Sequence, residues 1–134
     1  MGAEVRALHR PACLETDLVQ IYATVGNQEK REFLIDEFGI PAERILDSRS
    51  SAFVGDIKRL TKGVGVDIVL NSLSGELLHH SWDCVAEFGI LLEIGKRDLI
   101  GKGRLALAPF EMNRSYAGID LSHICALRKP VIKS

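Results

Sequence analysis

The sequence predicts a protein of the α/β class, built on a doubly wound parallel sheet. From Leu18 onward, short apolar runs alternate with amphipathic stretches, which is the pattern of parallel strands joined by crossover helices. The chain has 134 residues, of which 46% are hydrophobic, so it has room for one core but not for two full domains. We divide it into an N-terminal segment (residues 1–17), a domain (residues 18–127) and a basic tail (residues 128–134).

The first strand and helix of this pattern are clearly marked. Residues 19–25 are rich in β-branched and aromatic side chains, which predicts a strand. Asn27 is a good N-cap for a helix that follows directly, and Gly39 predicts where that helix ends. Leu34 and Phe38 lie one turn apart, so we expect them to share one face of the helix.

The same unit then repeats. Residues 45–46 can form a short strand, and Ser50 or Ser51 can cap a second helix that ends near Gly63. The apolar residues at helical spacing in this second helix are Phe53, Ile57 and Leu60.

The third unit contains the most apolar strand. Residues 66–70 are nearly all apolar, which predicts a central strand covered by helices on both faces. Ser74 can cap a third helix that ends at Gly89, before a strand at residues 90–94. The residues expected on one face of this helix are Leu77, Leu78, Trp82 and Val85. Residues 114–119 offer one more strand.

Composition restricts the classes of function. The formal net charge is −1 and the 17 basic residues are dispersed, which argues against a nucleic-acid partner. No apolar run approaches the ~20 residues needed to span a bilayer, and no secretory signal begins the chain. Cys13, Cys84 and Cys125 are odd in number and widely spaced, so we expect buried thiols and a cytoplasmic location.

Ligands of doubly wound sheets bind at the carboxyl ends of the strands, and the first informative end is residues 24–31. Gly26 and Asn27 stand where an NAD-binding strand would usually carry Asp or Glu. Lys30 and Arg31 follow in the first turn of the helix, where cations are unfavourable unless an anion binds. Helix N–H groups, a polar cap and two cations suit the 2′-phosphate of NADPH. An ordinary solvated start of a helix is the alternative.

Two further strand ends are polar. The turn at residues 71–75 (Asn-Ser-Leu-Ser-Gly) leaves the most apolar strand and opens a helix, so it can run beside a cofactor or can simply be a capped loop. At the next strand end, Gly95 lets the backbone approach a flat ring. Lys96 lies just beyond it and can donate a proton, although a surface lysine in a turn would have the same sequence.

Other chemistries find little support. Gly63-Val64-Gly65 is a turn rather than a dinucleotide fingerprint, because Ile68 occupies the third glycine position and a strand follows. His79 and His80 are adjacent on an expected helix and point to different faces, so we predict no metal site. No nucleophile elbow is present, which excludes the usual hydrolase arrangement.

Taken together, several strings resemble one family: the enoyl reductase domain of highly reducing, fungal-type polyketide synthases and of animal-type fatty acid synthases. This family belongs to the zinc-free group of medium-chain dehydrogenases and reductases. The resemblance covers about Ile21 to Ile124. The strings that carry it are Ala-Thr-Val-Gly-Asn-Gln-Glu-Lys-Arg (23–31), Phe-Gly-Ile-Pro (38–41), Asp-Ser-Arg (47–49), Gly-Val-Asp-Ile-Val-Leu-Asn-Ser-Leu-Ser-Gly (65–75) and Leu-Glu-Ile-Gly-Lys (92–96).

The resemblance implies reduction of a trans-2-enoyl thioester on an acyl carrier protein, with hydride from NADPH reaching the β carbon and a proton reaching the α carbon. It implies Lys96 and Asp120 as catalytic proton donors, and either group can deliver a proton while a lysine steadies the developing enolate oxygen. The cofactor-binding residues that it implies, together with those from the strand ends, are Thr24, Gly26, Asn27, Lys30, Arg31, Ser48, Arg49, Asn71, Ser72, Leu73 and Gly95.

The sequence departs from this family at its start. The family begins with a strand and a glycine-rich loop, which are not recognisable in Met1–Gln20, so the expected fold is a partial Rossmann-type sheet. We expect this to leave a central sheet edge unpaired and the fragment to be weak or inactive alone. The alternatives are a non-catalytic NADPH-binding or interaction module and an NADPH quinone reductase-like fragment. A homodimer through residues 115–119 is also expected.

Overall fold

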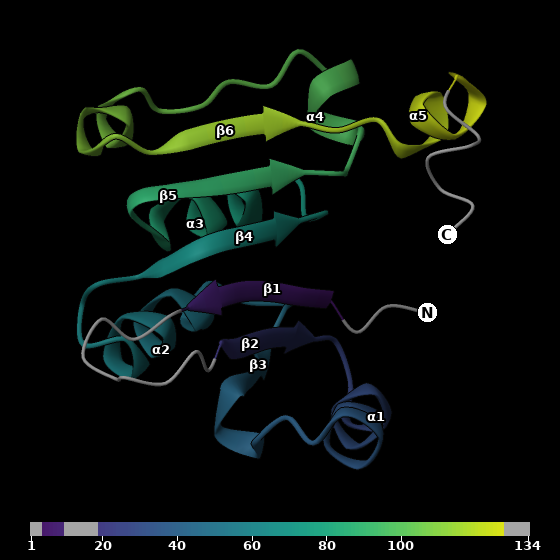
Figure 1. The fold of residues 1–134 in the computed structure, drawn as a ribbon, viewed down its shortest axis with the longest axis vertical. Helices are drawn as coiled ribbons and strands as arrows, with labels where there is room; N and C mark the ends of the chain where they lie inside the picture. Colours follow the sequence, from purple (N-terminus) through teal and green to yellow (C-terminus); the bar gives the residue numbers. More distant parts are fainter. Residues whose placement is uncertain (1–3, 10–18, 128–134) are drawn as a thin grey trace.

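A computed structural model describes the backbone of residues 4–9 and the whole of residues 19–127. Six strands form one sheet in the order β3-β2-β1-β4-β5-β6 (Figure 1). The strands are β1 (Glu4–His9), β2 (Gln20–Val25), β3 (Ile45–Asp47), β4 (Val66–Asn71), β5 (Val85–Glu93) and β6 (Ser115–Gly118). The predicted α/β class with a Rossmann-type sheet is thereby confirmed, and the strand order is that of the Rossmann fold.

β1 lies between β2 and β4 and runs antiparallel to both. The other neighbouring pairs (β2 with β3, β4 with β5, and β5 with β6) are parallel. The expectation of an unpaired central edge is therefore wrong, because the backbone of residues 4–9 supplies hydrogen-bonding groups to both neighbours. The rest of the expected N-terminal segment and the basic tail lie outside the described residues.

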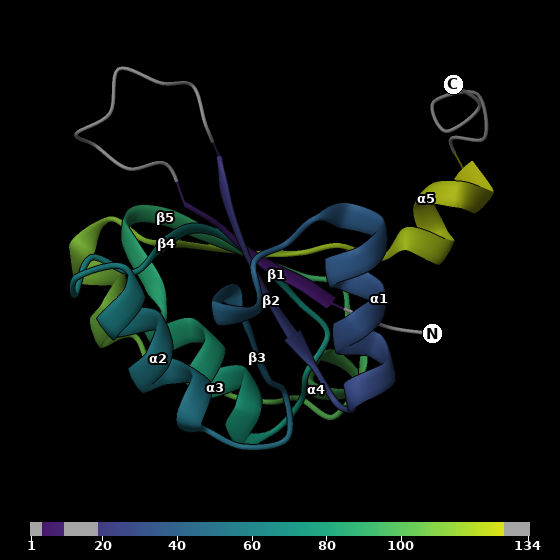
Figure 2. The same cartoon turned by 90° about the horizontal axis from the view of Figure 1, so that it is seen from below.

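Helices cover the two faces of the sheet unequally. α1 (Gln28–Phe38) lies on one face, whereas α2 (Ala52–Leu60) and α3 (Glu76–Asp83) lie on the other (Figure 2). Successive residues of β2 serve the two faces, as strand geometry requires: Ala23 packs in the cluster with α1, and Tyr22 packs in the larger cluster with α2 and α3.

α1 begins and ends at the expected residues. The Asn27 side chain accepts a hydrogen bond from the N–H of Lys30 at 2.9 Å, and Gly39 adopts a left-handed conformation (φ 64°) just after the last turn. Leu34 is buried, but Phe38 is 66% exposed, so the expected shared apolar face is wrong. Phe38 instead packs edge-on against Phe33 on the surface.

The third helix ends earlier than its apolar spacing predicts. α3 starts after Gly75 rather than at a Ser74 cap and stops at Asp83, so that Val85 already belongs to β5. The pairing of β4 with β5 shifts register within this stretch, where Phe88 has a φ of 63°. A Cβ at Gly89 would lie 2.8 Å from a methyl of Val85, so this irregular turn of the strand requires glycine.

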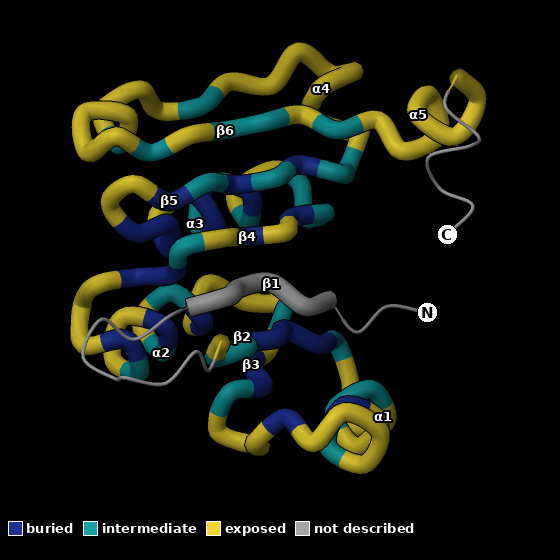
Figure 3. Tube along the Cα trace, viewed as in Figure 1, coloured by how far each residue is buried: buried dark blue, intermediate teal, exposed yellow. Residues whose placement is uncertain are grey.

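β4 is central, as expected, but it is covered on one face only. Val69 is buried under α2 and α3, whereas Ile68 and Leu70 on the opposite face are 37% and 39% exposed. Buried and exposed stretches alternate along β4 (Figure 3). α1 packs over β2 and leaves this part of the sheet open to solvent. The expectation of burial on both faces is therefore wrong.

The last part of the chain packs beside β5. It comprises α4 (Arg97–Ile100), a 3₁₀ turn (Ala108–Met112), β6 and α5 (Leu121–Leu127). Trp82 of α3 holds this region, since its indole N–H donates to the carbonyl of Ala106 and its ring packs against Phe110 and Tyr116.

The described cysteines differ in burial. Cys84 is buried as expected, but Cys125 on α5 is exposed, so a buried thiol at Cys125 was a wrong expectation. Cys13 lies outside the described residues. Within the described ranges, no helix combines the length and apolar character needed to cross a bilayer.

Candidate functional site

The carboxyl ends of β2 to β6 meet at one edge of the sheet (Figure 1). Two pockets with polar lining residues open at this edge. The first, which we call the β2–β3 pocket, has a volume of about 270 Å³. Its lining residues are Val25, Gly26, Asn27, Gln28, Arg31, Leu46, Asp47 and Arg49. The second, the β4–β5 pocket, has a volume of about 140 Å³. Its lining residues are Ser72, Leu73, Ser74, Glu93, Gly95, Lys96, Arg97 and Asp98.

The two arginines of the β2–β3 pocket have different surroundings. The guanidinium of Arg31 donates to the carbonyls of Ile45 and Ala42, each at 2.6 Å, and so ties α1 to the start of β3. The guanidinium of Arg49 lies against Gly26, and its backbone N–H donates to Asp47. Arg49 makes no side-chain hydrogen bond to a described residue, so it is the cation in this pocket best able to bind an anion.

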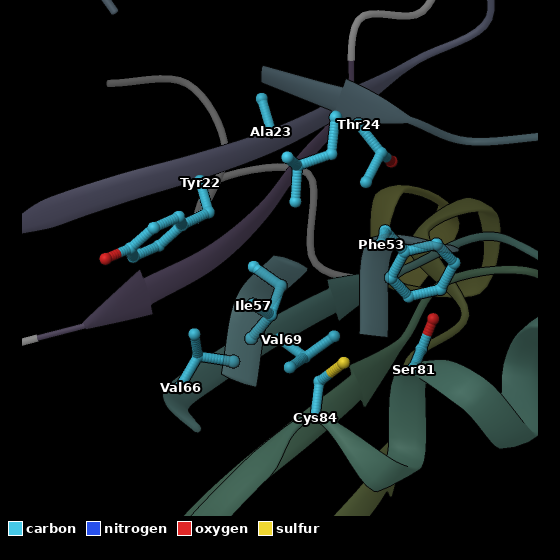
Figure 4. Close-up of a pocket in the computed structure, with 10 residues that line it drawn as sticks. Tyr22, Ala23, Thr24, Phe53, Ile57, Val66, Val69, Ser81 and Cys84 are labelled. Carbon is cyan, nitrogen blue, oxygen red and sulfur yellow. The ribbon is translucent and has the colours of Figure 1, made fainter. Parts of the chain in front are cut away.

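Three other predicted residues take different positions. Ser48 lies beside Gly26, next to the pocket, whereas Lys30 is not among the lining residues. The side chain of Thr24 points to the face of the sheet that α2 and α3 cover. It lines a small internal cavity of about 20 Å³ there (Figure 4). It is 3% exposed, and this burial separates it from the β2–β3 pocket.

The hydroxyl of Thr24 is buried with no hydrogen-bond partner among the described residues. We expect Thr24→Val to raise the free energy of unfolding by about 1 kcal/mol, because valine keeps the shape and removes an unpaired polar group. Urea denaturation followed by circular dichroism measures this change.

Thr61→Val is the matched control, since the buried Thr61 hydroxyl donates to the carbonyl of Ile57 and accepts from the N–H of Gly65. We expect this second substitution to destabilise by about 1–3 kcal/mol. A loss of stability in Thr24→Val comparable with that in Thr61→Val would contradict the prediction.

The β4–β5 pocket is built on two turns that approach one another. Asn71 stabilises the first turn by donating to the carbonyl of Leu73 and accepting from the N–H of Leu73. In the second turn, a Cβ on Gly95 would lie 3.1 Å from the carbonyl oxygen of Ser72, so glycine permits the close approach. The predicted residues Asn71, Ser72, Leu73, Gly95 and Lys96 are thus brought together.

Lys96 and Asp120 form an ion pair beside this pocket. The Nζ of Lys96 lies 2.8 Å from Oδ1 of Asp120, and each side chain is nearly half exposed. The hydrogen bond from Lys96 and a second one from the backbone N–H of His123 lower the pKa of Asp120 below its ordinary value. The structure therefore joins the two predicted catalytic residues, with Asp120 ionised at neutral pH.

This pairing predicts a titration result. A carboxyl whose pKa is lowered in the folded chain stabilises the fold at pH values above its ordinary pKa. This stabilisation is lost as the pH falls through the lowered pKa. We expect Lys96→Met to move the midpoint of Asp120 upward, as measured by nuclear magnetic resonance of the carboxyl carbon. Lys58→Met, on the exposed side of α2, is the control and should leave the midpoint in place. An unchanged midpoint in Lys96→Met would disprove the coupling.

Sequence reasoning missed three acidic residues that shape the two pockets. Asp47 is the last residue of the short strand β3, and Asp98 accepts from the N–H of Gly75 at the start of α3. Glu93 is 2% exposed at the end of β5. An acidic residue that ends an apolar strand, directly before a glycine turn, was the available signal for Glu93.

A doubly wound sheet with pockets at its carboxyl edge is typical of a nucleotide-binding domain. Residues 14–125 match the family described as zinc-binding dehydrogenase, and the chain belongs to that family. Among the described residues, no three His, Cys, Asp or Glu side chains could hold a metal ion, so this part of the chain does not fit the zinc of the family's name.

Its curated relatives include highly reducing polyketide synthases. One from a Fusarium species is 58% identical over 113 residues, and one from Gibberella moniliformis is 54% identical over 127 residues, 95% of this chain. These alignments cover only 4% and 5% of the relatives. A squalestatin hexaketide synthase of Cochliobolus lunatus matches over 129 residues, so the similarity runs beyond the expected span of Ile21–Ile124.

Solved structures give the same result. The nucleotide-binding subdomain of the enoylreductase domain of PpsC from Mycobacterium tuberculosis is 37% identical, with a TM-score of 0.71 over 81% of this chain and 59% of that chain. The CurK enoyl reductase is 33% identical, with a TM-score of 0.64 over 83% of this chain and 32% of that chain. The resemblance to part of a polyketide synthase enoyl reductase is confirmed.

Proposed function

We propose that the chain is the nucleotide-binding part of an NADPH-dependent enoyl reductase, which reduces trans-2-enoyl thioesters on an acyl carrier protein during polyketide synthesis. The observation that carries this proposal is the shared carboxyl edge, where the β2–β3 pocket with its arginines and the β4–β5 pocket beside Lys96 both open. The polyketide synthase relatives support the substrate class.

The residues of the two pockets fit opposite ends of NADPH. At the β2–β3 pocket, Arg49 and the N–H groups at the start of α1 suit the ribose 2′-phosphate. At the β4–β5 pocket, the small residues Ser72 and Gly95 leave room for a flat ring at the nicotinamide end. When bound, NADPH supplies the hydride for reduction.

Within this proposal, Lys96 and Asp120 have different roles. Asp120 is ionised at neutral pH because its pKa is lowered, so it carries no proton to give. The ammonium of Lys96 holds the proton that reaches the α carbon and also stabilises negative charge on the thioester oxygen. Asp120 orients that ammonium through the 2.8 Å ion pair.

A binding module without turnover is the second candidate, and the direction of β1 favours it. In a dinucleotide-binding sheet, the central strand ends in a glycine-rich turn and a helix N-terminus that holds the pyrophosphate. Here β1 runs the opposite way, so that its first residue, Glu4, pairs with Thr24 near the carboxyl edge. The described residues therefore offer no such donors to the pyrophosphate of NADPH. We expect the chain alone to bind NADPH weakly.

Calorimetry with NADPH and with NADH, together with an assay of NADPH oxidation by a crotonyl thioester, tests both candidates on the full chain. We expect weak binding with preference for NADPH and no turnover. Failure to bind either cofactor would overturn the nucleotide proposal, and normal turnover would overturn the expectation of an inactive fragment.

The edge strand β6 supports a further partner for this proposed domain. β6 is the last strand of the sheet, so one side of its backbone is available for pairing. We propose that a second copy of the chain pairs there, and sedimentation at increasing protein concentration would show the dimer.

A further inference from the structure

The carboxylate of Glu93 receives hydrogen bonds from β4, from the turn after β5 and from β6. Asn71, at the end of β4, donates to Oε2 at 2.7 Å, and the N–H of Gly95, just after β5, donates to Oε1 at 2.8 Å. The hydroxyl of Tyr116 on β6 donates to Oε2 at 3.4 Å. One buried side chain therefore connects β4, β5 and β6 where the β4–β5 pocket opens.

Burying the Glu93 carboxylate destabilises the fold unless all of these hydrogen bonds are made. Glu93 is 2% exposed, and no described cation lies within ion-pair distance of it, so only these three donors replace the water that an exposed carboxylate would bind. Burial accordingly raises the pKa of Glu93, while the hydrogen bonds from Asn71, Gly95 and Tyr116 act in the opposite direction. A residue that served only to fill the core would more cheaply be apolar.

The three donors fix both walls of the pocket. The amide of Asn71 is held in one orientation, because its oxygen accepts from the N–H of Leu73 while its nitrogen donates to Glu93. On the other wall, a Cβ on Gly95 would lie 2.9 Å from Oε1 of Glu93, so the turn is folded directly onto the carboxylate. Lys96 follows that turn by one residue.

We infer that Glu93 is a positioning residue, whose carboxylate sets the separation of the Asn71–Leu73 turn and the Gly95–Lys96 turn and so shapes the nicotinamide end of the site. The geometric part of this inference stands on the hydrogen bonds alone. Only the identity of the ligand rests on the proposed function.

Glutamine cannot replace this carboxylate. Glu93 acts as an acceptor in all three bonds, whereas an amide has one acceptor oxygen and one donor nitrogen. If the amide nitrogen faces Gly95, it meets an N–H. If it faces Asn71, it meets the NH₂ group of an amide that cannot turn over without losing its bond from Leu73. In either orientation, Glu93→Gln opens one wall of the pocket.

The experiment compares Glu93→Gln with Glu87→Gln in the full chain. Glu87 lies on the same strand but is exposed, so the control removes the same charge without touching the pocket. Amide hydrogen exchange is measured at Leu73 and Gly95, and at Lys30 in α1 as an internal reference. We expect Glu93→Gln to reduce protection at Leu73 and Gly95 about tenfold, with Lys30 unchanged, and Glu87→Gln to change none of them.

Ligand binding adds a readout that a general loss of stability would not produce. We expect Glu93→Gln to lower the affinity for NADPH about tenfold. The affinity for 2′-phospho-ADP-ribose, which lacks the nicotinamide, should change by less than a factor of two. An equal loss of affinity for both ligands would overturn the inference, and so would unchanged amide exchange rates at Leu73 and Gly95. If the unsubstituted chain binds no NADPH, the proposed function fails, and the exchange measurement still decides the role of Glu93.

If Glu93→Gln does not fold, Tyr116→Phe provides a second test of the inference. It keeps the ring against Trp82 and removes only the 3.4 Å donor. We expect about a two- to threefold loss of exchange protection at Gly95, in the same direction as the larger substitution, and no change at Lys30. Unchanged protection at Gly95 in this variant would count against the inference.

Discussion

Trp82→Ala is expected to lower the free energy of unfolding by about 3–5 kcal/mol, the range for truncating a large buried aromatic side chain. Trp82 is 1% exposed and packs against Phe110 and Tyr116, and its indole N–H donates to the carbonyl of Ala106. Its loss leaves a cavity and an unpaired carbonyl, and it releases the segment that packs beside β5. Urea denaturation followed by circular dichroism measures the change.

Two substitutions show which property of Trp82 matters. Trp82→Phe keeps most of the ring contact but loses the hydrogen bond to Ala106, so we expect a loss smaller than that of alanine. Ile100→Ala removes an apolar side chain that is 77% exposed, and we expect a change within about 0.5 kcal/mol. If Trp82→Ala destabilised no more than Ile100→Ala, the packing described for α3 would be incorrect.

Arg49→Ala is expected to weaken NADPH binding about 10- to 100-fold, the range for one hydrogen bond to a charged group. Its guanidinium lies against Gly26 in the β2–β3 pocket without a side-chain hydrogen bond to a described residue. NADH lacks the 2′-phosphate, so its affinity should change little. Calorimetry with the two cofactors separates loss of phosphate recognition from general damage to the pocket.

Arg31→Ala is the matched control for Arg49→Ala. Because the guanidinium of Arg31 donates to the carbonyls of Ile45 and Ala42, we expect this substitution chiefly to lower stability, by about 1–3 kcal/mol, and to weaken NADPH and NADH alike. A selective loss of NADPH binding in Arg31→Ala, with none in Arg49→Ala, would show that the wrong arginine has been assigned to the phosphate.

Local sequence signals predicted much of the fold. The cap at Asn27 and the left-handed turn at Gly39 fix α1 through backbone groups within a few residues, and the structure places both as expected. The end of α3 and the exposure of Phe38 depend on strand pairing and on which helices reach which face. Such tertiary effects override periodicity, and the position of β1 is another example.

The candidate site was predicted only in part, for a similar reason. Spacing and family resemblance selected the turns at residues 71–75 and 95–96, which the structure brings together. They could not show that the Arg31 side chain is occupied by backbone carbonyls, nor that Thr24 points toward the core. Glu93 was missed because two of its three partners lie 22 and 23 residues away in the chain.

The open face of β4 has a calorimetric consequence. Water already contacts Ile68 and Leu70 in the folded chain, so unfolding adds less newly hydrated apolar surface there than under a covering helix. The heat capacity change of unfolding grows with such newly hydrated area, and it sets the curvature of stability against temperature. The stability of this chain should therefore vary less steeply between cold and warm conditions than that of a sheet covered on both faces.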